Sequence, residues 1–122
     1  MLLSPELIEQ QLVIIPNTRK TFVFDLDGTI VYDGKPLEAR FERVLLDIKA
    51  AGHEITIATG RSWRDFVPIM PAWCSEQPSV VFGGGLVMVD GSPQSQHFLP
   101  NNYLVEMIDF LERHKINYLL DG

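Results

Sequence analysis

The sequence predicts an α/β fold: a parallel sheet with helices on both faces, followed by the start of a smaller α/β segment. Apolar stretches rich in β-branched residues predict three buried strands, at residues 21–24, 54–59 and 80–82. Helical patterns lie between them, and strands that alternate with helices favour parallel pairing through right-handed crossovers. Because a hairpin pattern after Gly85 interrupts this order, we expect a core at residues 1–84 and a second, separately organised segment at residues 85–122.

In the first half of the chain, local signals place the elements around the first two strands. Residues 4–6, Ser-Pro-Glu, are typical of a helix start, and this short helix should end before Pro16. Residues 30–35 contain an Asp-Gly turn and predict a small hairpin that projects beyond the first strand. Pro36 then opens a helix whose apolar residues repeat at helical spacing, and Gly52 ends it.

The second half contains signals for a short helix, a hairpin and a longer helix. Ser62 can cap the short helix, which the prolines after it end. Residues 86–99, with an Asp-Gly turn among them, predict the hairpin. The longer helix should be capped by Asn101 or Asn102, and basic residues at its end suit the helix dipole. Residues 116–120 are a further strand candidate.

Composition and charge narrow the range of functions. With 122 residues, 46% of them hydrophobic, the chain is long and apolar enough for one domain with a core. A net charge of −6 argues against nucleic acid as a partner, because no basic stripe offsets phosphate repulsion. No apolar run approaches the length of a membrane span, and the N-terminus lacks a secretion signal. Cys74 is the single cysteine, so we expect a cytoplasmic protein in a reducing compartment.

The residues that say most about function directly follow the first strand. Residues 22–24 lead into Asp25 and Asp27, whose carboxylates would point the same way if the strand continued. Gly28 then permits a sharp turn close to a ligand, and Thr29 follows it. Open α/β sheets bind ligands at the carboxyl ends of their strands. Two acids and a Gly-Thr pair at that edge indicate a site for a cation and a phosphate.

The Asp-Leu-Asp-Gly run has plainer interpretations, because such runs also occur in turns and in calcium-binding loops. A calcium loop needs a Glu at its twelfth position, and counting from Asp25 that position is Pro36, which excludes this interpretation. A turn alone does not account for the preceding strand together with the Gly-Thr pair. His97 and His114 lack the spacing of metal ligands, which argues against zinc.

A second group of polar residues ends the next strand. Thr59 offers a hydrogen bond, Gly60 allows close backbone approach and Arg61 supplies positive charge, so the three together suit phosphate oxygens. Taken alone, the tripeptide is explained equally well as a helix cap followed by a surface arginine. If the first two strands are neighbours, these residues lie beside Asp25 and Asp27, and the phosphate interpretation becomes much stronger.

Together these motifs resemble the haloacid dehalogenase (HAD) superfamily of phosphohydrolases. Its first motif is a hydrophobic strand ending in Asp-x-Asp-Gly-Thr, which residues 22–29 match fully, and its second is a strand ending in Thr or Ser, which Thr59 matches. The Ala-Thr-Gly-Arg run at residues 58–61 resembles the Cof-like branch, which has a Rossmann-like core and a large α/β cap after the third strand. That branch often continues with Asn-Gly-Ala, whereas this chain has three glycines at residues 83–85, so the resemblance leaves the substrate open.

The resemblance implies a role for each matched residue. Asp25 would attack phosphorus and become a phosphoaspartate, and Asp27 would protonate the leaving alcohol and then activate water. Both would bind Mg²⁺, Asp27 through its backbone carbonyl, and the cation would offset repulsion between carboxylate and phosphate. Thr59 would orient the phosphoryl group. The phosphate-binding residues that the resemblance implies are Gly28, Thr29, Thr59, Gly60 and Arg61.

The later motifs of the family, a lysine and a pair of acids often written Gly-Asp-x-x-x-Asp, find no match after residue 85. We therefore expect a truncated product or fragment in which Mg²⁺ has too few protein ligands and phosphatase activity is weak or absent. The expected substrates are small phosphorylated metabolites such as sugar phosphates. One alternative is a receiver-like phosphoacceptor module, although the glycines after the third strand argue against it. The other is a non-catalytic remnant that binds a partner or oligomerises through an uncovered sheet edge.

Overall fold

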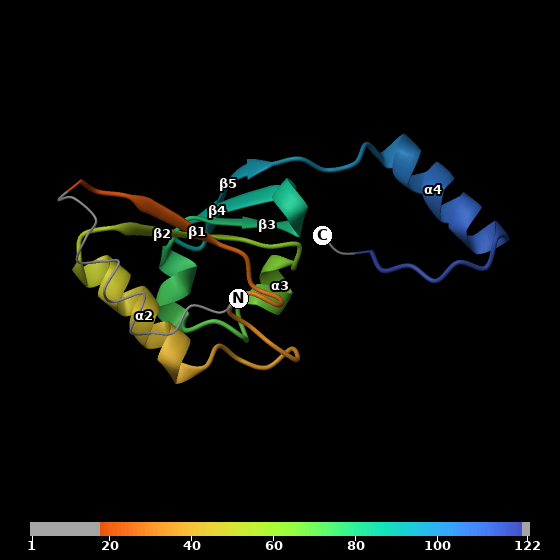
Figure 1. The fold of residues 1–122 in the computed structure, drawn as a ribbon. Helices are drawn as coiled ribbons and strands as arrows, with labels where there is room; N and C mark the ends of the chain where they lie inside the picture. The colour runs from red at the N-terminus through yellow and green to blue at the C-terminus, as the bar shows by residue number, and fades with distance from the viewer. Residues whose placement is uncertain (1–17, 121–122) are drawn as a thin grey trace.

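A mixed five-stranded sheet organises the protein (Figure 1). The computed structural model describes residues 18–120, so the helix expected from residues 4–6 onward lies outside the described residues. The strands follow chain order across the sheet, and the first three are parallel while the last two are antiparallel. They are β1 (Thr21–Phe24), β2 (Glu54–Ala58), β3 (Ser79–Val81), β4 (Leu86–Val89) and β5 (Ser92–Gln96). The three predicted parallel strands and the α/β class are therefore confirmed.

Two α-helices pack against this sheet, and a third stands apart from it (Figure 1). The α-helices are α2 (Ala39–Ala50), α3 (Trp63–Phe66) and α4 (Asn101–Arg113), and the 3-10 helices are η1 (Ala72–Glu76) and η2 (Phe82–Gly84). Each connection between parallel strands runs through a helix, as right-handed crossovers require. No described helix has both the length and the apolar character needed to cross a membrane.

The core lies between the sheet and the face covered by α2 and α3. Ile55 and Ile57 of β2 alternate toward this face and are 1% and 0% exposed, where they meet Leu45 of α2 and Phe66 of α3 in one cluster. On the opposite face, Val23 of β1 is 62% exposed. Both crossovers lie on the same face because β1, β2 and β3 are added in one direction, and right-handed crossovers change face only when that direction reverses. Within the described residues, the sheet therefore carries its packed helices on one face rather than on both.

Helix α2 ends where the sequence predicts but begins later. Gly52 has a φ of +86° just past the C-terminus, which is the conformation that favours glycine at this position. The predicted start at Pro36 is wrong, since the first helical residue is Ala39. Leu37 explains the delay: its amide donates to the Ile69 carbonyl at 2.8 Å and its side chain is buried, so this residue is tied to the core in an extended segment.

The projecting hairpin predicted at residues 30–35 is wrong. Ile30 and Val31 are buried, and their amides donate to the Leu26 carbonyl at 3.0 and 2.9 Å instead of pairing across two strands. The predicted turn at Asp33 does exist, with a positive φ of 56° there. The apolar residues before it fold inward, because burying them in the core is more favourable than exposing them on an isolated two-stranded ribbon.

After β3 the chain follows the predicted order with three differences. The hairpin is confirmed, but its second strand begins at Ser92, and β4 pairs with β3 so that the hairpin extends the same sheet. At α4, Pro100 takes the N-cap position and neither Asn101 nor Asn102 caps the helix. The strand predicted at residues 116–120 is wrong, since no neighbouring strand pairs with it in the described part of the chain. The division at residues 84 and 85 stays a prediction.

Candidate active site

The sheet brings the two predicted motifs to one edge. In the parallel register, Phe24 of β1 lies opposite Ile57 of β2, so both strands end on the same side. Asp25 follows β1 directly, and Thr59 follows β2 directly. The third strand ends there too, since Ala58 is paired with Val80. The neighbouring placement on which the phosphate interpretation depended is thus present in the structure.

The loop after β1 is a compact turn built on Leu26. This side chain is fully buried, and its carbonyl accepts hydrogen bonds from the amides of Thr29 and Val31 at 3.0 and 2.9 Å. Gly28 adopts a φ of +78°, and its amide donates to the Val31 carbonyl at 2.9 Å. With Leu26 pointing inward, Asp25 is left exposed, and its Oδ2 accepts a hydrogen bond from the Thr29 hydroxyl at 3.4 Å. The turn therefore holds the first acid at the surface of the sheet edge.

Asp27 forms a bidentate ion pair with Arg61. The Arg61 Nε donates to Oδ2 at 2.7 Å and Nη2 donates to Oδ1 at 2.6 Å. These hydrogen bonds lower the pKa of the Asp27 carboxyl, with burial acting in the opposite direction and the charge of Arg61 adding to the effect. The same contact raises the pKa of Arg61. Asp27 is therefore ionised at neutral pH, which suits a base.

Thr59 and Arg61 are fixed by hydrogen bonds to the residues that follow β3. Thr59 is buried, its amide donates to the Val80 carbonyl at 2.9 Å, and its carbonyl accepts from the Gly83 amide at 3.1 Å. The Arg61 carbonyl accepts from the Phe82 amide at 2.8 Å. The Arg61 amide donates to the Thr59 hydroxyl oxygen at 3.1 Å, which leaves the hydroxyl hydrogen free to donate to a ligand.

Sequence reasoning missed the part that Phe82 and Gly83 play in supporting this loop. Both have positive φ values, 53° and 61°, in the turn that follows β3. The Phe82 amide donates to the Arg61 carbonyl and the Gly83 amide donates to the Thr59 carbonyl, so both residues act through their backbone. The glycine run marked a turn, but only the pairing of β2 with β3 shows what that turn contacts.

The described residues offer few ligands for the Mg²⁺ that the resemblance implies. Asp25 and the Asp27 backbone carbonyl offer oxygen atoms, the ligand type that Mg²⁺ prefers. Among residues 18–120, however, no group of three or more His, Cys, Asp or Glu side chains is arranged to hold a metal ion. The carboxylate of Asp27 is also engaged by Arg61. The donors that are present fit Mg²⁺ in kind but are too few to bind it alone.

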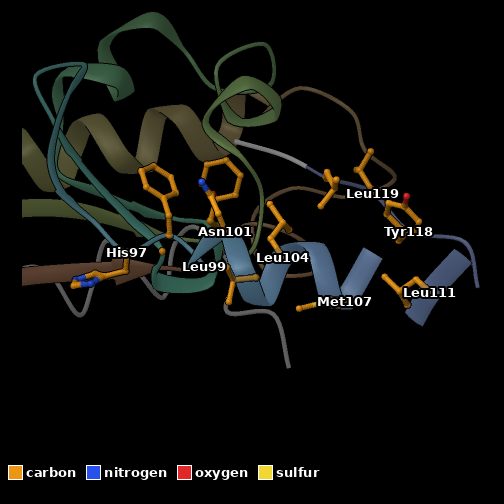
Figure 2. Close-up of a pocket in the computed structure, with 12 residues that line it drawn as sticks. His97, Leu99, Asn101, Leu104, Met107, Leu111, Tyr118 and Leu119 are labelled. Carbon is orange, nitrogen blue, oxygen red and sulfur yellow. The ribbon is translucent and has the colours of Figure 1, made fainter. Parts of the chain in front are cut away.

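A cavity of the described structure lies away from this sheet edge (Figure 2). It has a volume of about 660 Å³ and runs along α4 between Leu99, Met107 and Tyr118. Its walls are mostly apolar, and His97 and Asn101 are among the few polar residues that line it. None of the predicted site residues lines it, so the cavity and the candidate active site are separate features.

Comparison with known structures supports the fold. The chain is similar to a haloacid dehalogenase-like hydrolase from B. subtilis, with a TM-score of 0.69 and 17% identity. It is also similar to a hypothetical protein from Geobacillus kaustophilus HTA426 (0.65, 22%) and to a phosphatase of the haloalkanoate (HAD) enzyme superfamily from Bacteroides thetaiotaomicron (0.62, 16%). These matches cover 80%, 80% and 83% of this chain but only 34%, 38% and 38% of the three structures. The chain therefore spans between a third and two fifths of their length, and no curated protein matches it.

The family comparison extends over most of the chain. Residues 22–122 match the family of haloacid dehalogenase-like hydrolases, and the match begins at Phe22 in the strand that leads into the Asp-Leu-Asp-Gly-Thr motif. This match includes Asp25, Asp27 and Thr59, which the structure places at one sheet edge. It also favours a hydrolase over the receiver-like alternative. The chain belongs to the haloacid dehalogenase-like hydrolase family.

Proposed function

We propose that this chain carries the nucleophile half of a phosphatase site that acts on small phosphorylated metabolites. The observation that carries the proposal is the juxtaposition of Asp25 and Asp27 with Thr59 and Arg61 at the ends of neighbouring parallel strands. One strand supplies carboxylates and the other supplies hydrogen-bond donors and positive charge. Phosphoryl transfer to a carboxylate requires this combination, because charge must be stabilised on the transferring group.

In the proposed reaction, an Asp25 oxygen attacks phosphorus, the bond between phosphorus and the alcohol oxygen breaks, and a phosphoaspartate forms. Asp27, which is ionised in its contact with Arg61, first takes up a proton from solvent and gives it to the leaving alcohol. The carboxylate that this restores then takes a proton from the water that attacks phosphorus. This second attack releases inorganic phosphate and restores Asp25. The Thr59 hydroxyl donates to a phosphate oxygen, with the Gly60 backbone and Arg61 assisting. The loop of Gly28 and Thr29 completes the phosphate-binding edge.

We further propose that the site uses Mg²⁺, which would be held by an Asp25 oxygen and the Asp27 carbonyl and would offset the charge of the phosphate. Since the described residues offer too few ligands, turnover by this chain alone should be weak. The single cysteine fits a reducing compartment, and we place the protein in the cytoplasm.

Hydrolysis of p-nitrophenyl phosphate with and without Mg²⁺ tests the proposal on the full chain. Any magnesium-dependent turnover should disappear in Asp25→Asn. It should remain in Asp33→Asn, a matched control in an exposed turn whose positive φ asparagine tolerates. Turnover that persists in Asp25→Asn contradicts the nucleophile assignment. Robust turnover that only Asp25→Asn abolishes supports the nucleophile and contradicts the proposed weakness.

One observation favours a second role, self-association through a sheet edge. Strand β1 lies at an edge of the described sheet, and Val23 within it is 62% exposed. Unpaired edge strands are templates for pairing with another chain. Size-exclusion chromatography would show a dimer that Val23→Lys dissociates and that Val105→Lys, on exposed α4, leaves intact. A monomer in the unchanged chain contradicts this role.

A further inference from the structure

The guanidinium of Arg61 uses only one of its edges on Asp27. Arginine presents five N–H donors in a rigid plane. The Nε hydrogen and one Nη2 hydrogen, on the side-on edge, are taken by the two Asp27 oxygens. No acceptor among residues 18–120 bonds the two Nη1 hydrogens or the second Nη2 hydrogen. The outer edge of the guanidinium therefore remains available while the inner edge is occupied.

The position of this guanidinium is set from both ends. At its backbone, the Arg61 amide donates to the Thr59 hydroxyl oxygen and its carbonyl accepts from the Phe82 amide. At its tip, the fork to Asp27 fixes the plane of the group. The side chain is 22% exposed, compared with 80% for Arg43 and 74% for Arg113, so much of its length is enclosed. A side chain held in this way loses little further entropy when it binds a ligand.

We propose that Arg61 is a positioning residue for Asp27, and that it keeps this contact while its outer Nη edge binds an oxygen of the substrate phosphate. The inference deepens the proposed phosphatase function and rests on it. A phosphate monoester is an anion that would be repelled by the Asp27 carboxylate, and a guanidinium between them neutralises part of this repulsion while fixing their separation. Lysine could not do both, because an ammonium lacks the planar fork.

Side-chain NMR of the ¹⁵N-labelled full chain tests the positioning role without any need for turnover. Hydrogen exchange at the Arg61 Nε should be about tenfold slower or more than at the Nε of Arg19, whose side chain is 72% exposed and contacts Glu54 through Nη2 only, as expected for a hydrogen bond to a charged group. Asp27→Asn should remove this protection. Asp65→Asn should keep it, because Asp65 acts on Arg61 by charge alone and makes no hydrogen bond to its guanidinium. Fast Nε exchange in the unchanged chain overturns the proposal, as does equal loss in the two variants.

Titration with inorganic phosphate tests the second edge. The Arg61 Nη signals should shift more than the Nε signal, while the slow Nε exchange is preserved. Loss of Nε protection on adding phosphate shows that Arg61 leaves Asp27 for the anion and overturns the two-edge arrangement, and an absence of Nη shifts overturns phosphate binding. If both NMR results are as expected but Asp25→Asn keeps all turnover, the proposed nucleophile fails while the role of Arg61 stands.

Discussion

Two glycines of the candidate site allow backbone strain to be measured separately from side-chain packing. A Cβ added at Gly28 or at Gly60 would meet no atom within 4 Å, so alanine fits the space at both positions. Only Gly28 has a left-handed φ, of +78°. Alanine at the two positions therefore differs chiefly in whether the backbone conformation suits an L residue.

The expected magnitudes follow from two opposing effects. An L residue in the left-handed region costs about 1–2 kcal/mol, and Gly→Ala stabilises by about 0.4–1 kcal/mol because the unfolded chain loses freedom. Gly28→Ala should thus lower the free energy of unfolding by about 1 kcal/mol. Gly60→Ala should raise it by about 0.4–1 kcal/mol. The two variants should differ by about 1–2 kcal/mol.

Urea unfolding followed by tryptophan fluorescence measures this difference, because Trp63 and Trp73 both pack against the core. The slope of the transition should stay unchanged, so that a shift in midpoint reports stability alone. Equal unfolding free energies for Gly28→Ala and Gly60→Ala would refute the reasoning. So would a larger loss at Gly60.

Three further predictions concern single groups. Burial, with a smaller effect of the Glu42 charge, raises the pKa of the Cys74 thiol to about 12. The thiol should therefore react slowly with Ellman's reagent in the folded chain and quickly in the chain unfolded by urea, and fast labelling of the folded chain contradicts this. The free energy of unfolding should also fall as the pH rises from about 8.5 to about 12, because the folded state holds the thiol proton more tightly than the unfolded state. Trp73→Phe removes the 3.0 Å hydrogen bond from Nε1 to Glu42 and should cost about 1 kcal/mol in urea unfolding, whereas Glu42→Gln keeps an acceptor and should cost less. Because its pKa is lowered in the folded chain, the contact of Asp27 with Arg61 contributes stability above about pH 3.9, and this stability is lost as the pH falls through the folded-state pKa of Asp27. The unfolding free energy of Asp27→Asn should therefore fall less between neutral and acid pH than that of the unchanged chain. An equal fall in both chains contradicts this prediction.

The sequence predicts best where a local signal and a tertiary contact agree. The strand at residues 21–24 has its predicted bounds, and the Ser62 hydroxyl accepts from the Asp65 amide at 3.1 Å, as a helix cap should. The placement of Asp25 and Thr59 at one edge of the sheet was also predictable, because neighbouring parallel strands end at the same edge. The spacing of the motifs and the order of the strands are therefore sufficient to predict which residues lie at the candidate site.

The sequence predicts poorly where long-range contacts decide. Residues 116–120 have the composition of a strand, but a strand forms only beside a partner, and none is present among the described residues. Arg61 has a long side chain whose direction depends on its neighbours, so sequence could assign it to phosphate but not to Asp27. The late start of α2 depends on Ile69, far along the chain, whose carbonyl takes the amide of Leu37.

The separation of α4 from the sheet has a practical consequence for the candidate site. Residues 97–100, which join β5 to α4, are exposed and form no regular structure, and Phe98 among them is 68% exposed (Figure 1). Proteases cut most readily in such connections. Brief treatment with chymotrypsin should therefore cleave after Phe98, leaving a shortened chain that retains all five strands and every residue from Asp25 to Arg61.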